Sequence, residues 1–282
     1  MKNSRSFSSG QIFCTVFFAL AALALFTLPA RAQTWQGTTS GNFGGSTNWR
    51  STPAFNTSTD LAFSASIANA SSTSTLAFLG ANRIIRSLNF DANADSNVFI
   101  RLTSTVSNTT ARNLTFQAAS GSANLTIAYG ATGNYTIGLS TGSVVLGSGL
   151  LIDHSGTGNL TIDRVISGIG FGITKNGTGA LTLFAADAFT GGATGGNVTI
   201  AASQNLTIAK TNTNTFSGSI QGWGNLSKTG VGTLTLNASN TYTSATTIGS
   251  SNGANAGTLQ LSGSGTISNA ATTIFGGTLP QI

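Results

Sequence analysis

The amino-acid sequence predicts an all-β protein whose short strands stack into a β-solenoid. Three observations predict this fold: a composition that disfavours helices, short segments that alternate apolar and hydroxyl residues, and a glycine-pair motif that recurs along the chain. A short repeat cannot bury its apolar face alone and gains a continuous core only by stacking on its neighbours. Repetition of this kind is therefore typical of a solenoid.

The composition argues against long helices and against charge-driven disorder. The 282 residues include 36 Gly, 44 Thr, 35 Ser and 25 Asn, no Glu, and only 6% charged residues. Gly, Ser, Thr and Asn are weak helix formers, and the Glu and Lys that usually cover helix surfaces are scarce or missing. Seventeen Phe and a mean hydropathy of +0.19 supply apolar groups for a core. The composition therefore favours an all-β protein with a surface of hydroxyls and amides.

The net charge of +6 does not indicate nucleic-acid binding. Three of the twelve basic residues lie within the first 32 positions, which leaves nine basic and six acidic residues, or +3, in the rest of the chain. Four arginines fall in one stretch without stacked aromatic residues: Arg83, Arg86, Arg101 and Arg112. Because a phosphate-binding face needs clustered positive charge, we expect no nucleic-acid partner.

Residues 1–32 have the pattern of a secretory signal peptide. A basic start precedes an apolar run over 12–28, and Ala30 and Ala32 occupy the two positions that signal peptidase requires to be small. We expect cleavage before Gln33, although a run of this length also approaches that of a transmembrane anchor. Cleavage removes the single cysteine, so the mature chain, residues 33–282, would be exported without a disulfide or a thiol nucleophile.

Two copies of one unit, at residues 166–194 and 220–248, give the strongest internal repeat. The segment KNGTGALTL, which begins at Lys175, matches KTGVGTLTL, which begins at Lys228. Leu-Thr or Leu-Gln pairs begin at positions 160, 181, 206, 234 and 259, at intervals that are typical of structural repeats. We expect each interval to be one coil, so that a coil has roughly 20–28 residues.

Strand periodicity predicts how such a coil is built. Side chains alternate in and out along a strand, so Leu and Ile would point inward while Thr and Asn face solvent. The glycine pairs would form the tight bends, where a positive φ or crowding excludes a side chain. At a spacing of ~4.8 Å, about 11 coils would make a rod on the order of 50 Å long.

The second repeat resembles a known family. Residues 222–243 (GWGNLSKTGVGTLTLNASNTYT) look like the autotransporter-associated β-strand repeat of bacterial surface proteins, and residues 168–194 resemble it more loosely. The starting segment, residues 33–60, is similar to the N-terminal cap of such proteins, with Phe43 where a tryptophan is usual. The resemblance implies a right-handed parallel β-helix displayed outside the cell. Such proteins end in a membrane β-barrel or a sorting signal; residues 276–282 carry neither, so an anchor further on or release both stay open.

One acidic segment resembles a cation-binding loop. Asp91, Asn93 and Asp95 place oxygen-bearing side chains at alternate positions, as in the first half of an EF-hand. Ser96 replaces the glycine of that loop and Leu102 its bidentate glutamate. A solvated polar turn is therefore favoured over a weak calcium site.

Two further groups of polar residues are candidates for catalytic sites. The sole histidine, His154, stands between Asp153 and Ser155, but neighbours in a strand point to opposite faces, which argues against a triad and favours a turn or surface position. Asp153 and Asp163 are about half a coil apart and are expected on different faces. A carbohydrate-active β-helix would need paired acids, for which Asp91 and Asp95 beside Arg83 or Arg101 are the best candidates.

These observations predict an exported, non-enzymatic bacterial surface protein, a structural stalk or adhesin-like passenger located outside the cell or at the outer membrane. Rows of Thr, Ser and Asn would suit it to contact surface polysaccharide or other cell-surface molecules. No catalytic residue, metal site or cofactor is expected. The alternative is a polysaccharide lyase or hydrolase on the same fold.

Overall fold

The structure is a computed structural model. It describes residues 32–35, 40–63, 74–92, 94, 97–105, 110–139, 141–168, 170–183, 198–209, 213–251 and 257–280. The predicted signal peptide, apart from Ala32, and residues 169 and 184–194 of the first repeat copy lie outside these residues. Within the described part, no helix is long and apolar enough to cross a membrane.

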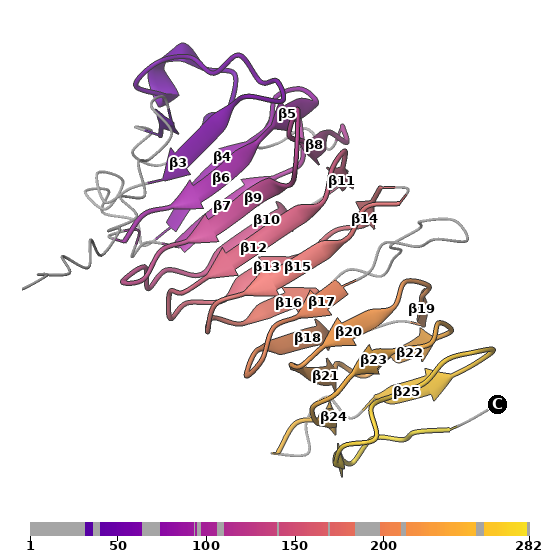
Figure 1. The fold of residues 1–282 in the computed structure, drawn as a ribbon. Helices are drawn as coiled ribbons and strands as arrows, with labels where there is room; N and C mark the ends of the chain where they lie inside the picture. Colours follow the sequence, from indigo (N-terminus) through magenta and orange to yellow (C-terminus); the bar gives the residue numbers. More distant parts are fainter. Residues whose placement is uncertain are drawn as a thin grey trace, which may run out of the picture.

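The described chain forms an all-parallel β-helix, which confirms the predicted solenoid. Its strands stack along one axis into two long sheets and two short ones, from the indigo N-terminal coils to the yellow C-terminal ones (Figure 1). The nine-stranded sheet contains β1 (Gln33–Thr34), β3 (Asp60–Phe63), β6 (Ser87–Phe90), β9 (Ala123–Ile127), β12 (Leu150–His154), β15 (Ile173–Asn176), β17 (Val198–Ile200), β20 (Ile220–Gly222) and β23 (Thr241–Tyr242). The ten-stranded sheet contains β2 (Ser40–Asn42), β4 (Ser74–Phe78), β7 (Asn97–Arg101), β10 (Tyr135–Leu139), β13 (Leu160–Ile162), β16 (Leu181–Leu183), β18 (Asn205–Ala209), β21 (Asn225–Thr229), β24 (Thr246–Gly249) and β26 (Thr272–Phe275).

The third side of the β-helix is made of two short sheets. The four-stranded sheet contains β5 (Arg83–Ile85), β8 (Asn113–Phe116), β11 (Ser143–Leu146) and β14 (Ile166–Ser167), and the three-stranded sheet contains β19 (Asn214–Phe216), β22 (Thr233–Leu236) and β25 (Thr258–Leu261). A 3-10 helix, η1 (Ser46–Asn48), lies near the start. In a full coil the chain passes from the nine-stranded to the ten-stranded sheet and then to a short one.

The strand register corrects part of the predicted coil pattern. Leu160, Leu181 and Leu206 are paired on successive coils of the ten-stranded sheet, as expected. The next partner of Leu206 is Leu226, however, and Leu234 pairs with Leu259 in the three-stranded sheet. The prediction that Leu206 and Leu234 are one coil apart was therefore wrong. Leu226 lies one coil after Leu206, and Leu234 lies past the next corner, on another side of the β-helix.

Several coil steps are longer than the predicted range, as from Ser40 to Leu76, from Leu114 to Val144 and from β6 to β9. Leu88 pairs with Leu125, one coil further on, whereas Gly222 pairs with Tyr242 across a much shorter stretch of chain. The coil from β6 to β9 contains an excursion between β7 and β8, closed by an antiparallel bridge between Thr103 and Ala111. Such an insertion leaves the stacked strands in register, since it leaves and rejoins the coil at a corner.

The core is a set of ladders in which each inward side chain rests on its equivalent one coil away. One ladder in the nine-stranded sheet consists of Leu61, Leu88, Leu125, Ile152, Lys175, Ile200, Gly222 and Tyr242. Its aliphatic members are all fully buried. Removal of each such side chain from water contributes roughly 1.5–3 kcal/mol, so the ladders supply the main stabilising term.

An aromatic cluster covers the core at the N-terminal end. Trp35 packs on Phe43, Trp49 and Phe63, with ring centroids 5.9, 4.9 and 5.5 Å away. The Trp49 indole donates a 2.7 Å hydrogen bond to the Phe43 carbonyl, which satisfies its polar atom inside the cluster. Phe43 therefore fills an aromatic position of this cluster.

The two repeat copies do not occupy the same face. In the first copy Lys175 lies in β15 of the nine-stranded sheet, whereas in the second Lys228 lies in β21 of the ten-stranded sheet. The step from Lys175 to Lys228 thus equals two coils and one further corner. The repeated sequence specifies a strand, a corner and the next strand, wherever in the coil these fall.

The ladder packing predicts which substitutions weaken the fold. Ile152→Ala should lower the free energy of unfolding by about 2–5 kcal/mol, because it leaves a cavity between Leu125 and Lys175. The outward Thr161→Ala is the control and should cost about 1 kcal/mol or less. Urea unfolding followed by circular dichroism measures both, and equal losses would contradict the assignment of inward and outward faces.

Candidate functional site

The candidate calcium loop is only partly described. Asn93 and Asp95 lie outside the described residues, whereas Asp91 follows β6 and its carbonyl accepts a 2.8 Å hydrogen bond from the Ala94 amide. Burial raises the pKa of the Asp91 carboxyl. Among the described residues, no three His, Cys, Asp or Glu side chains are close enough to hold a metal ion.

The two arginines proposed beside Asp91 lie in other sheets. Arg83 begins β5 in the four-stranded sheet, where its guanidinium carbon lies 4.1 Å from the Phe55 ring centroid and its Nε donates to the Leu79 carbonyl. Arg101 ends β7 in the ten-stranded sheet. Arg83 is thus engaged with Phe55, which stacks on Phe43 of the N-terminal aromatic cluster.

The other described carboxylates belong to separate surroundings. Asp60 is buried and accepts hydrogen bonds from Arg86 and Ser87. Asp153 is exposed in β12 of the nine-stranded sheet, and Asp163 follows β13 of the ten-stranded sheet. The prediction that Asp153 and Asp163 lie on different faces is confirmed.

His154 is buried, so the prediction of a turn or surface position is wrong. It is the last residue of β12 and is 0% exposed, because it continues the inward ladder of Phe90 and Ile127. Its Nδ1 lies 3.1 Å from the Ala180 carbonyl, so Nδ1 carries the proton and donates. The Nε2 atom is buried and has no hydrogen-bond partner among the described residues.

Burial and a neighbouring cation both oppose protonation of this ring. Burial is the larger cause and the Lys175 charge the next; together they lower the pKa of His154 to about 4. The second glycine of the next corner accommodates the ring, since a Cβ at Gly179 would overlap it.

The alternation of inward and outward residues that begins at Leu150 could have placed His154 inward, but the polarity of histidine favoured a surface position.

Two lysines, which the sequence interpretation did not place, also point into the core. Lys175 and Lys228 are both 0% exposed. The Lys175 Nζ donates to the Asn176 and Gly177 carbonyls at 2.6 and 2.8 Å. The Lys228 Nζ donates to the Thr229 and Gly230 carbonyls at 2.7 Å each.

The motif Lys-x-Gly-x-Gly is therefore a corner with its own cation. The lysine is the penultimate residue of its strand, points inward and donates to the carbonyls of the next two residues. Gly177 and Gly230 adopt φ values of +74° and +78°. These positive values need glycine. Burial lowers the pKa of Lys175 to about 8. Both lysines have structural partners, and neither faces solvent as a nucleophile would.

The outer surface carries two polar rows along the axis. The first, the hydroxyl ladder, lies on the ten-stranded sheet and consists of Thr136, Thr161, Thr182, Thr207, Ser227, Thr247 and Thr273. The second, the amide row, lies just before or at the start of the same strands and consists of Asn97, Asn134, Asn159, Asn205 and Asn225. These rows confirm the predicted outward position of Thr and Asn on the ten-stranded sheet, with the exception of Thr246, which is 0% exposed and continues the inward ladder of Leu226.

The amide row is held by contacts between coils. Asn97 Oδ1 accepts from the Asn134 backbone N–H at 2.8 Å, and Asn134 Oδ1 from that of Asn159 at 3.0 Å. Further along, Asn205 Oδ1 accepts from the side-chain amide of Asn225 at 2.9 Å. At the position between, the Ala180 carbonyl accepts from the ring of His154 instead.

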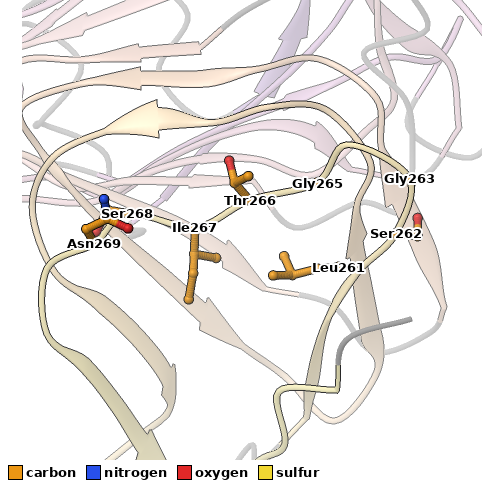
Figure 2. Close-up of a pocket in the computed structure, with 8 residues that line it drawn as sticks. All are labelled: Leu261, Ser262, Gly263, Gly265, Thr266, Ile267, Ser268 and Asn269. Atoms are coloured by element: carbon orange, nitrogen blue, oxygen red, sulfur yellow. The ribbon is translucent and has the colours of Figure 1, made fainter.

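A hollow of about 440 Å³ lies at the C-terminal end of the β-helix. It is lined by residues 261–263 and 265–269, where the chain leaves β25. Figure 2 shows Leu261 and Ile267 on the inner side of this loop, with Thr266 pointing the other way. Its lining contains no ionisable side chain. The hollow therefore has a binding-pocket volume without the groups that acid–base chemistry requires.

Comparison of the chain with protein-family models, with curated proteins and with solved structures found no match. What the protein does is therefore inferred from its own residues.

The corner lysines predict a loss of stability when the ammonium is removed. Lys228→Met should lower the free energy of unfolding by about 1–3 kcal/mol, because the Thr229 and Gly230 carbonyls lose their donor. Ile208→Met, one coil away in the same ladder, is the control and should cost less than about 1.5 kcal/mol. Denaturant unfolding measures the free energy of unfolding of both variants. A Lys228→Met chain as stable as the wild type would mean that the ammonium does not stabilise the fold.

His154 predicts acid sensitivity. The unfolded state takes up a proton near pH 6.5 and the folded state only near pH 4, so the free energy of unfolding should fall as the pH drops through this window. The shift corresponds to about 3 kcal/mol. His154→Ile, which matches its ladder neighbour Ile127, should flatten that part of the profile. Urea titrations at pH 4 to 7 test this, and parallel profiles for the two proteins would rule out the histidine as the cause.

Proposed function

We propose that this chain is an exported, non-enzymatic β-solenoid that serves as a rigid stalk or adhesin-like passenger on a bacterial surface. The observation that carries the proposal is the continuous stack of parallel coils with an uncharged hydroxyl ladder on its longest sheet. Such a surface offers many weak hydrogen-bonding groups on a stiff support. It suits contact with neighbouring surface molecules better than it suits catalysis.

The corner motif supports the proposed kinship with autotransporter-associated β-strand repeats. The residues that carry this resemblance include Lys228, Gly230 and Gly232, and they form the corner in which the lysine binds two carbonyls. The looser copy at Lys175 forms the same corner. The repeated residues are thus explained by folding of the coil, as a structural repeat requires.

The described carboxylates give the alternative, a polysaccharide lyase or hydrolase, little support. Glycoside hydrolysis needs two carboxyl groups across one bond. Asp95, the proposed partner of Asp91, lies outside the described residues. Asp60 is bound to Arg86, Asp153 lies on the nine-stranded sheet, and Asp163 follows β13 beside Arg164. These acids do not form such a pair.

Export is tested through the leader. The secreted protein should begin at Gln33 by N-terminal sequencing and should be digested by protease added to intact cells. Changing Ala30 and Ala32 together to Leu should block cleavage, because the peptidase needs small residues at both positions. Arg31→Lys, which lies between them, is the control and should be processed normally.

Two outcomes would contradict the proposal. A chain that keeps Met1 and stays in the cytoplasm is not exported. Turnover of a polysaccharide by the purified protein, lost on Asp91→Ala, would replace the structural role with a catalytic one.

A further inference from the structure

Two large aromatic side chains project from one corner of the β-helix. Tyr129 is 85% exposed and lies in the turn between β9 and β10, and Trp223 is 69% exposed and lies in the turn between β20 and β21. Both turns join the nine-stranded sheet to the ten-stranded sheet. The other two tryptophans, Trp35 and Trp49, are buried in the N-terminal cluster, so exposure distinguishes Trp223.

Between these two rings, the turns at the same corner present small residues. The intervening turns follow β12, β15 and β17 and contain small residues at 155–158, 177–180 and 201–203. Gln204, the larger residue of the last turn, is buried. The two rings therefore stand at the ends of a low strip. β9 and β20 are four strands apart in their sheet, which places the rings roughly 19 Å apart along the axis.

The strip is bordered by fixed amides. Asn134 and Asn159 are exposed near the Tyr129 end, and Asn205 is exposed near Trp223. The Oδ1 atoms of Asn134 and Asn205 are engaged by the next coil, which fixes the position of their N–H donors. The hydroxyl ladder continues the same polar surface onto the ten-stranded sheet.

The charge of this corner favours an uncharged ligand. No Asp, Glu, Lys, Arg or His occurs in the described turns between the two long sheets from Tyr129 to Trp223. Asp153 in β12 lies beside these turns, and its exposed carboxylate would repel an acidic polymer. An aromatic face and amide donors together match a sugar ring whose flat side carries C–H groups and whose rim carries hydroxyls.

We propose that this corner binds a neutral β-1,4-linked glucan chain along the axis of the β-helix, with one sugar stacked on Tyr129 and another on Trp223. The inference rests on the proposed adhesin-like role and names the ligand of that role. A β-1,4-linked glucan fits because its ring substituents are equatorial, which leaves both faces of each sugar apolar. One sugar covers about one coil spacing, so only a chain of several sugars reaches both rings.

Cellohexaose and cellobiose test the proposal on the purified full chain. Because Trp223 is the exposed tryptophan, both sugars should shift the fluorescence, and Trp223→Ala should abolish the shift. Cellohexaose should bind at least tenfold more tightly than cellobiose in calorimetry, since the second contact becomes intramolecular. Tyr129→Ala should remove this tenfold advantage but keep the cellobiose shift.

Val231→Ala is the matched control, because Val231 is 66% exposed at the corner between β21 and β22 and should leave both affinities unchanged. Polygalacturonate, which is acidic, should not bind. Equal affinity for the two sugars, unchanged binding in both aromatic variants, or an equal loss in Val231→Ala would overturn the proposal. Binding to the purified chain does not depend on export, so failure here is distinct from failure of the proposed location.

Discussion

In-register pairing of parallel strands is the constraint on which the whole molecule depends. Each strand gives its backbone groups to the coils before and after it, so every side chain is placed over its equivalent one coil away. Apolar residues then form continuous inner ladders, and hydroxyls form a continuous outer one. Whether a residue fits an inward position consequently depends more on its two neighbours in the ladder than on its neighbours in the sequence.

The corners decide where polar groups can enter this interior. A tight turn points carbonyl oxygens inward, where no strand is available to donate to them, and a buried polar acceptor is costly when unpaired. Lys175 and Lys228 supply the donor from the end of the preceding strand, and His154 does the same for the Ala180 carbonyl. The interior therefore tolerates these three ionisable groups because each serves a corner.

The fold could be predicted from the sequence because strand alternation is a local property. Leu181-Thr-Leu183 and its relatives show which residues face inward without knowledge of their partners. The inward lysines and histidine could not be placed in this way. Burial of a charged or polar group is unfavourable unless it is hydrogen-bonded, and the carbonyls that accept these hydrogen bonds are known only from the three-dimensional structure. The pairing of Leu206 with Leu226 was also hidden, since Leu234 repeats the same local pattern on another face. Likewise, Tyr129 and Trp223 share no sequence pattern, and only the stacking of coils brings them to one corner.

The shift of the repeat from one face to the next has a consequence for how such a chain can evolve. A duplication of the segment that separates Lys175 from Lys228 does not add whole coils, so it turns everything downstream by one face. The core accepts this rotation, because each copy of the unit carries the glycines and the lysine of its own corner. Gain or loss of one unit would therefore turn the outward side chains of the downstream coils to another side of the axis, while the packing of each coil stays the same.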